Sequence, residues 1–155
     1  LLITDNIGDD SLRSPLTQFS RAQLLMYQHR YDEALMTLDS LNIDFPLNSL
    51  GDDILYERFR VAYARHQYDT ASTFLEKVLE LYPNDILVDN ALLDLGKVYE
   101  DKLNDKEKAK SYYEKLLFEQ GGSIFVPEAR DRFRRLRGDH DELDTPEQKF
   151  LNGPQ

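Results

Sequence analysis

Cysteine and tryptophan are absent from the 155 residues of this chain, and methionine occurs only twice. The lack of cysteine excludes a disulfide framework, a thiol nucleophile and zinc sites built on cysteine. No apolar run reaches the length of a membrane span, so the chain is not expected to cross a membrane. A glycine-rich phosphate loop and a serine nucleophile elbow are also missing. We therefore expect no catalytic activity and no cofactor.

Positive charge is in the minority. The chain carries 19 Lys and Arg against 29 Asp and Glu, which gives a net charge of −10. Binding to nucleic acid is driven by positive charge, so nucleic acid is not an expected partner. The acidic balance favours solubility and a basic protein or peptide as partner. An apolar content of 41% is sufficient for a packed core.

The chain does contain an internal repeat, marked by three alanines that lie 37 and 38 residues apart, Ala34, Ala71 and Ala109. In the first copy Leu38 and Leu41 follow the alanine at the helical offsets i+4 and i+7. A period of this length is typical of stacked helical hairpins, so each copy is expected to contribute two helices. The three predicted hairpins are residues 15–46, 52–83 and 85–120.

Signals at the helix ends support this division. Pro46 and Pro83 stop the second helix of the first two copies, and Ser14 is a predicted N-cap. Residues 124–137 are predicted to form a closing helix, because a repeat array needs a last helix with a polar outer face. The predicted domain therefore spans 14–137, between a polar segment at 1–13 and an acidic tail at 138–155.

The third copy carries the most specific motif. Leu95-Gly96 followed by Tyr99, and then Ala109 and Tyr113, resembles the two helices of a tetratricopeptide repeat. This resemblance implies an all-α, right-handed solenoid of three hairpins plus the closing helix, and it implies protein–protein interaction as the function. The copies are degenerate, and the second exchanges a small and a large residue at Phe59 and Ala62.

The closing helix, with its Pro127-Glu128-Ala129-Arg130 start, resembles that of tetratricopeptide proteins in the bacterial cell envelope, including lipoproteins of Bacteroidetes. The resemblance implies a periplasmic or envelope setting rather than a cytoplasmic one. Because the chain opens on Leu1 without an initiator methionine, we expect it to be part of a larger protein, with any anchor upstream.

A partner-binding groove is predicted from helical offsets, taking Ala22, Phe59 and Gly96 as equivalent positions of the first helices. Aromatic and polar side chains mixed in this way suit an extended peptide or a helix. The alternative is that Phe19 and Tyr56 only pack between neighbouring helices. Self-association stays open. The predicted groove residues are Phe19, Gln23, Met26, Tyr56, Arg60, Tyr63, Asn90, Lys97 and Glu100.

His29 and His66 occupy equivalent positions, immediately before the second helix of their copies. A shared metal site is one interpretation, but equivalent residues of neighbouring repeats lie about 8–10 Å apart or more, too far to share an ion. We instead expect both histidines in tight turns, because histidine adopts the left-handed backbone conformation more readily than most residues.

Two further segments have a functional alternative. Asp139-His140-Asp141-Glu142 is a concentrated set of metal ligands, although a solvated tail is the simpler interpretation. The closing helix is rich in arginine and is interpreted as a solvated cap, onto which the acidic tail could fold back. A structural spacer that packs against upstream repeats, and weak metal binding by the tail, are the two alternatives to partner binding.

Overall fold

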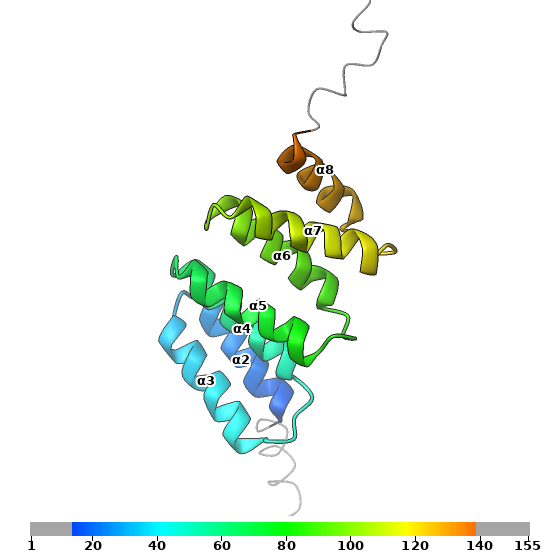
Figure 1. Cartoon of the computed structure of the whole chain (residues 1–155). Helices are drawn as coiled ribbons and strands as arrows, with labels where there is room; N and C mark the ends of the chain where they lie inside the picture. Colours follow the sequence, from blue (N-terminus) through cyan, green and yellow to red (C-terminus); the bar gives the residue numbers. More distant parts are fainter. Residues whose placement is uncertain (1–13, 139–155) are drawn as a thin grey trace, which may run out of the picture. The chain divides into compact units, whose positions relative to one another are not determined.

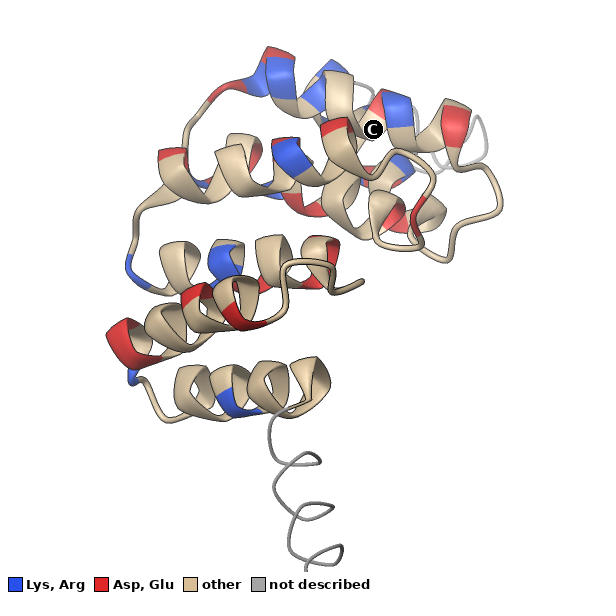
Figure 2. Cartoon of the chain, turned by 90° about the horizontal axis from the view of Figure 1, so that it is seen from below, with Lys and Arg blue, Asp and Glu red and all other residues tan. Residues whose placement is uncertain are grey.

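The computed structural model describes residues 14–138, and seven helices lie within them (Figure 1). No strand occurs in this part of the chain, so the predicted all-α fold is confirmed. Acidic and basic residues are interspersed along the helices (Figure 2). The helices are α2 (Pro15–Tyr27), α3 (Tyr31–Asp44), α4 (Gly51–Ala64), α5 (Tyr68–Leu81), α6 (Val88–Asp101), α7 (Lys106–Glu119) and α8 (Val126–Arg137).

The chain forms two compact units. The first runs to Asp85 and contains α2 to α5, and the second begins at Ile86 and contains α6 to α8. In the first unit α2 packs on α3 and α4 packs on α5, and α4 also contacts the earlier hairpin. In the second unit α6 packs on α7, and α8 packs on α7. Each hairpin is thus a pair of helices joined by a short turn. Within residues 14–138 no helix is both long and apolar enough to span a membrane.

The small residue of each second helix lies at the centre of its hairpin. Ala34, Ala71 and Ala109 are all buried, on α3, α5 and α7 respectively. The leucines that follow them at helical spacing, Leu38 and Leu75 among them, are buried as well. The helical-repeat pattern predicted from the sequence is therefore confirmed. Its repeating unit is a hairpin of two helices that bury an alanine side chain between them.

The turns inside the hairpins use left-handed backbone. His29 and His66 both have φ of +60°, and Asn104 takes φ of +54° at the corresponding turn of the third hairpin. The Nδ1 atom of each histidine is hydrogen-bonded to a tyrosine hydroxyl. His29 pairs with Tyr31 at 2.8 Å, and His66 pairs with Tyr68 at 2.7 Å. The turn prediction is confirmed, and these hydrogen bonds explain how a non-glycine residue is held in this conformation.

Substitution of His66 tests the turn. Because a β-branched residue is disfavoured in the left-handed region, His66→Val is expected to lower the free energy of unfolding by about 1–2 kcal/mol. His66→Gly is expected to stay within about 1 kcal/mol of the wild type, since glycine adopts this conformation freely. The control is Gln67→Val at the next position, where φ is −91°. Urea unfolding followed by circular dichroism measures all three, and equal effects of the two valines would refute the strained turn.

Helix ends follow the sequence signals at two places. The Ser14 side chain accepts a hydrogen bond from the Thr17 backbone N–H at 3.2 Å. The Asp105 side chain accepts one from the Lys108 backbone N–H at 3.0 Å. The predicted N-cap at Ser14 is therefore confirmed, and both side chains satisfy a backbone donor that the first turn leaves free.

The third hairpin closes most tightly, at Gly96. The Tyr113 ring of α7 lies against this glycine, and a Cβ added there would lie 2.6 Å from Cδ1 and 2.7 Å from Cζ of the ring. Tyr113 is fully buried. In the second hairpin, Phe59 and Ala62 are both buried, so the exchanged large and small residues both contribute to the core.

Candidate binding surface

A buried carboxylate lies among the predicted groove residues of the first unit. Glu57 on α4 is only 3% exposed. Its Oε1 accepts a hydrogen bond from Gln23 Nε2 of α2 at 3.0 Å and forms an ion pair with Arg60. A buried charge is tolerated when it is paired and hydrogen-bonded, so Glu57 fixes Gln23 and Arg60 in place. Glu57 was not predicted from the sequence as a member of this surface.

The aromatic residues of this region form a layer with a buried and an exposed side. Phe19 and Tyr56 are buried, as the packing alternative required. The Phe59 ring lies edge-on to Tyr56, with 5.5 Å between centroids, and lies 5.8 Å from Tyr63. The Arg60 guanidinium lies over the Tyr56 ring at 5.2 Å. Of the predicted aromatic residues in this layer, Tyr63 is the one that reaches the surface.

Exposed side chains on the same helices define what we term the tyrosine–arginine face. Tyr63 is 38% exposed and Tyr27 is 83% exposed. Tyr27 follows Gln23 by four residues on α2, which places the two side chains on one side of the helix. Met26 is half-buried beside them. Tyr27 was not predicted from the sequence as a groove residue. The face consists of Gln23, Tyr27, Arg60 and Tyr63.

Negative charge gathers at the start of α4. Burial raises the pKa of Asp52, and a hydrogen bond with Asp85 raises it further. Burial also raises the pKa of Asp53, and the negative charges of Asp85 and Glu57 raise it further. The positive charge of Arg60 acts in the opposite direction and lowers that pKa. A raised carboxyl pKa means that the ionised form is disfavoured at this place.

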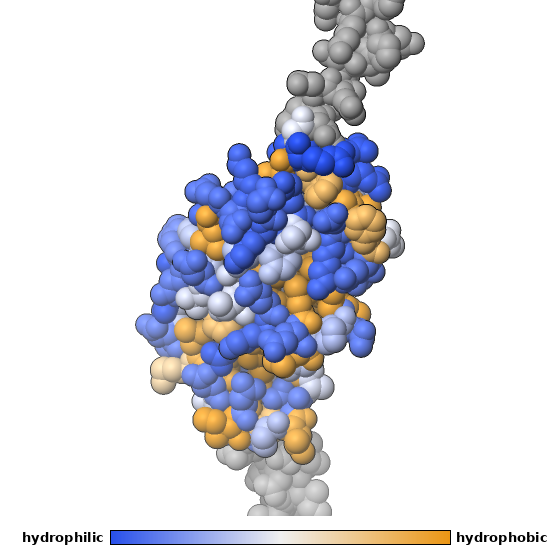
Figure 3. Space-filling model, in the orientation of Figure 1, coloured by the Kyte–Doolittle hydropathy of each residue, from blue (hydrophilic) through white to orange (hydrophobic). Residues whose placement is uncertain are grey.

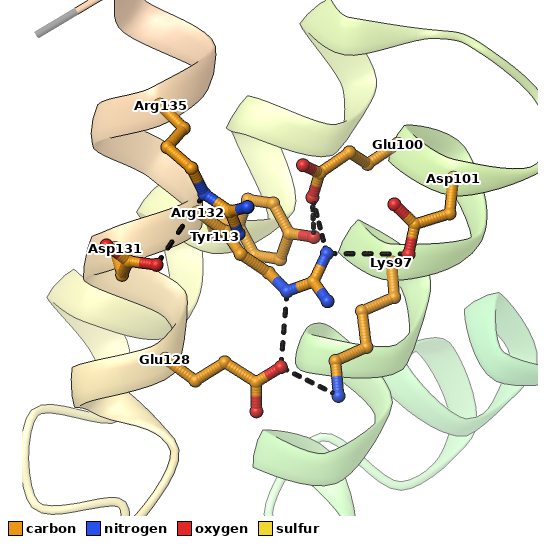
Figure 4. Close-up of polar contacts among 8 residues, drawn as sticks. All are labelled: Lys97, Glu100, Asp101, Tyr113, Glu128, Asp131, Arg132 and Arg135. Carbon is orange, nitrogen blue, oxygen red and sulfur yellow. Dashed lines mark hydrogen bonds and ion pairs between the residues drawn. The ribbon is translucent and has the colours of Figure 1, made fainter. Parts of the chain in front are cut away.

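In the second unit the polar side chains meet at Arg132 of α8 (Figure 4). Arg132 Nη1 lies 2.9 Å from Glu100 Oε2 and 3.4 Å from Asp101 Oδ2, and its Nε lies 3.1 Å from Glu128 Oε1. The Arg132 side chain is 19% exposed. The interpretation of the α8 arginines as solvated is therefore wrong for Arg132, because two carboxylates of α6 hold it against the hairpin.

Two of the predicted groove residues of α6, Lys97 and Glu100, take part in this cluster. The Tyr113 hydroxyl donates to Glu100 at 2.6 Å, and burial together with this hydrogen bond raises the pKa of that hydroxyl well above its usual range. Lys97 Nζ lies 2.9 Å from Glu128 Oε1 and lowers the pKa of that carboxyl. Lys97 and Glu100 thus bind α8 within the unit, as Figure 4 shows.

Asn90, in the first turn of α6, is half-buried and is not one of the residues of the Arg132 cluster. Its backbone N–H donates to Asp89 Oδ1 at 2.8 Å, and Asp89 Oδ2 accepts from the Ser123 hydroxyl at 2.6 Å. The Ser123 hydroxyl oxygen also accepts a hydrogen bond from the Phe125 backbone N–H at 3.1 Å. This chain of hydrogen bonds ties the segment before α8 to α6 and was not predicted from the sequence.

A surface hollow of about 460 Å³ lies elsewhere, between α2 and α3, and the predicted groove residues do not line it. Its walls include Leu25, Met36 and Thr37. Among residues 14–138, no three histidine, cysteine or acidic side chains are grouped so as to hold a metal ion. The candidate ligands Asp139 to Glu142 lie outside the described residues.

Residues 61–85 and 90–117 match the family model of the tetratricopeptide repeat. These two segments are similar to tetratricopeptide repeats. The first covers the end of α4 and all of α5, and the second covers most of α6 and α7, so the match reaches both units. No curated protein matches the chain.

The family predicted from the Leu95-Gly96 and Tyr99 motif is thus supported by the match over α6 and α7. The hairpin of α2 and α3 lies outside both matched segments, and its likeness to a tetratricopeptide repeat stays a prediction from the alanine spacing. Tetratricopeptide repeats generally mediate protein–protein interaction, and they typically serve as scaffolds rather than enzymes.

Proposed function

We propose that this chain is a non-catalytic scaffold that binds a protein partner, as a peptide or a helix, through the tyrosine–arginine face of its first unit. The observation that carries the proposal is the exposure of Tyr63 close to Arg60 on α4, above a buried aromatic layer, together with the exposure of Tyr27 on α2. Tyrosine and arginine contribute more to protein interfaces than other residue types, particularly near the centre of a contact.

Pre-organisation supports this assignment. The buried carboxylate of Glu57 and the ring of Tyr56 both hold the Arg60 side chain before any partner arrives. The entropic cost of ordering a long side chain on binding, about 0.5–1.5 kcal/mol each, is thereby reduced. Tyr63 is likewise supported, by Phe59 on one side and by the Tyr68 ring at 5.3 Å on the other.

The charge near this face favours a basic partner. Asp52, Asp53 and Asp85 gather at one end of α4, where burial raises the pKa of Asp52 and Asp53 and the repulsion between the carboxylates adds to that effect. A lysine or arginine of the partner would relieve that repulsion, whereas a carboxylate would increase it. We therefore expect a peptide with a basic residue close to the group that contacts the tyrosines.

Paired substitutions test the proposal. Arg60→Gln with Tyr63→Ala is expected to reduce partner capture from the source cell at least tenfold, since two anchors are lost. Glutamine keeps a hydrogen-bond donor for Glu57, and Tyr56 is left unchanged because it is buried. The matched control is Lys115→Gln with Phe118→Ala, an exposed pair at the same spacing on α7.

Quantitative mass spectrometry of the captured proteins compares the two variants with the wild type. A partner that is lost with the first pair and kept with the control supports the proposal. Equal capture by both variants would show that binding takes place elsewhere, and the circular dichroism spectrum of each variant verifies that the helices are intact.

A second candidate function is a structural spacer whose first hairpin packs against a further helix. The hollow between α2 and α3, with Met36 exposed at its wall, is the observation that favours it. Oxidative footprinting is the test, since methionine sulfur reports its own accessibility. Protection of Met36 in the native protein, relative to the isolated 155 residues, would support the spacer, and equal oxidation would remove it.

We further propose that the protein works in a bacterial cell envelope. The support is the resemblance of the repeats and of the closing helix to envelope proteins of this kind, including Bacteroidetes lipoproteins. Fractionation of the source cell with an antibody against this chain gives the answer. Recovery with the envelope fraction agrees with the proposal, and recovery with the cytosol contradicts it.

A further inference from the structure

Little apolar contact holds α8 to the second unit. Of its 12 residues only Ala129 is buried, whereas each of the other six described helices buries at least three. Phe133 and Leu136 are half-buried. Figure 3 shows strongly hydrophilic side chains gathered over α8. Because hydrophobic stabilisation scales with the apolar area that is buried, polar contacts make up an unusually large part of the attachment of α8.

The polar contacts of α8 follow one short pattern. Glu128 pairs with Lys97 at 2.9 Å, and Arg132, one turn later, pairs with Glu100 at 2.9 Å. Ala129, which is fully buried, follows Glu128 directly. α6 thus presents a cation and a carboxylate on successive turns, and α8 supplies the opposite charges in the matching order (Figure 4). Charge pairs at a fixed spacing give specificity and register more than affinity.

The surface that receives α8 is organised by contacts between α6 and α7. The Tyr113 hydroxyl donates to Glu100 at 2.6 Å, which orients the carboxylate that pairs with Arg132. The Tyr113 ring is fully buried and lies against Gly96. A binding surface that is ordered in advance costs less entropy to occupy. The α6–α7 hairpin therefore has the properties of a helix-binding site, and α8 is the helix that occupies it.

The connection before α8 contains a hinge. Gly121 and Gly122 lie in the loop between α7 and α8. A Cβ added at Gly122 would meet nothing within 4 Å, and one added at Gly121 would meet the Leu117 carbonyl oxygen at 3.8 Å. Glycine adopts either sign of φ readily, so this pair can redirect the chain at little steric cost. Exchange of an identical element between copies proceeds through a hinge loop of this kind.

The sequence of α8 favours a second copy of this chain as the occupant of the site. A glutamate directly followed by an alanine occurs twice in the 155 residues, at Glu33 and at Glu128. Four residues after Glu128 stands Arg132, whereas Thr37 takes that place after Glu33. A second copy carries both this pattern and the site that recognises it. Two chains that exchange α8 therefore form a closed pair.

We propose that the α6–α7 surface beneath α8 is a helix-binding site at which α8 of a second copy replaces the chain's own α8. The exchange is reciprocal, and each copy contributes Glu128, Ala129 and Arg132 to the site of the other. The contacts are those formed within one chain, so the exchanged pair gains population as protein concentration rises. The inference does not depend on the tyrosine–arginine face, which lies in the other unit.

Mixed single-cysteine variants of the full 155-residue chain test the exchange, because the native chain has no cysteine. One chain carries Lys97→Cys, and a second, lengthened by an affinity tag, carries Glu128→Cys. The Lys97 and Glu128 side chains meet in the folded unit, so a short bismaleimide joins the two chains when α8 of the tagged chain lies on the other chain's hairpin. Arg132 and Glu100 are unchanged in both chains.

The control pair is Lys77→Cys with Glu128→Cys, since Lys77 is exposed on α5 of the first unit. We expect about tenfold more cross-linked heterodimer from the test pair than from the control, because bound segments meet at a much higher effective concentration than free chains. Denaturing gel electrophoresis separates the heterodimer from the two monomers by mass.

Arg132→Ala distinguishes exchange from random collision. In the Lys97→Cys chain it weakens the attachment of that chain's own α8, and we expect a several-fold higher yield of heterodimer. In the Glu128→Cys chain it weakens the incoming helix, and we expect a several-fold lower yield. Arg132→Gln, which keeps a hydrogen-bond donor for Glu100, replaces it if the alanine variant loses its helical circular dichroism.

Arg130→Ala is the matched control, because Arg130 is exposed on the same helix, and it is expected to leave the yield unchanged in either chain. A higher yield in one arrangement of the Arg132 substitution and a lower yield in the other supports the exchange. A yield no higher than that of the Lys77→Cys pair, or a change of the same sign in both arrangements, would overturn the proposal.

Discussion

Arg132→Ala is expected to lower the free energy of unfolding by about 2–4 kcal/mol. The substitution removes the cation that pairs with Glu100, whose side chain is only 15% exposed. The Glu100 carboxylate then keeps its hydrogen bond from the Tyr113 hydroxyl but loses its ion pair with Arg132. Breaking a buried ion pair typically costs about 3–5 kcal/mol, and partial exposure reduces that cost here. Contacts of the arginine stem with the hairpin are lost as well.

Urea unfolding measured by circular dichroism compares this variant with Arg130→Ala, which removes an exposed arginine of the same helix. The control is expected to stay within about 0.5 kcal/mol of the wild type. A double-mutant cycle with Glu100→Gln then isolates the pairwise term, because the neutral glutamine no longer requires a cation. Similar effects of the two arginine variants would show that Arg132 is not the anchor of α8.

The second large effect is expected at Gly96. In an exposed helix, Gly→Ala stabilises by about 1 kcal/mol through helix propensity. Here the added methyl group meets the Tyr113 ring, which is fully buried and whose hydroxyl is hydrogen-bonded to Glu100. Overpacking costs typically about 1–3 kcal/mol, so Gly96→Ala is expected to destabilise despite the better propensity.

Gly51→Ala is the matched control for this substitution. An added Cβ at Gly51 also meets a tyrosine, but the contact is with the hydroxyl end of Tyr82, which is half-buried and able to swing away. We expect a change within about 0.5 kcal/mol. Thermal and urea unfolding of both variants decide the matter, and a stabilised Gly96→Ala variant would contradict the close approach of α6 and α7.

The repeating part of this fold could be predicted from the sequence because it depends on local chemistry. The alanine spacing marks where two helices of one hairpin meet, and His29 and His66 occupy a turn that few other residues accept. Such features are carried by single residues at fixed offsets. They need no knowledge of which distant segment lies opposite.

The polar contacts could not be predicted in the same way. Arg132 pairs with Glu100, 32 residues earlier, and on the sequence of α8 alone it is indistinguishable from its exposed neighbour Arg130. Glu57 joins Gln23 across 34 residues, and a glutamate directly before Arg58 is interpreted as a surface residue until α2 is placed beside α4. Charge patterns on a helix do not reveal which side a partner helix covers.

The tyrosine–arginine face shows the same limit. Helical offsets found Tyr63 and Arg60, but they also selected Tyr56, which is buried, and passed over Tyr27, which is exposed. Offsets give the direction of a side chain from its own helix axis. Exposure depends in addition on the depth to which neighbouring side chains fill the space around it.

Site-specific photo-crosslinking tests the scaffold proposal most directly. A benzophenone amino acid replaces Tyr63 in the chain expressed in its source cell, and a second strain carries it at Phe118, an exposed aromatic position of the other unit. We predict a covalent adduct with one protein at position 63, through a segment that contains a basic residue, and no such adduct at position 118. Equal adducts at both positions, or none at position 63, would contradict the account.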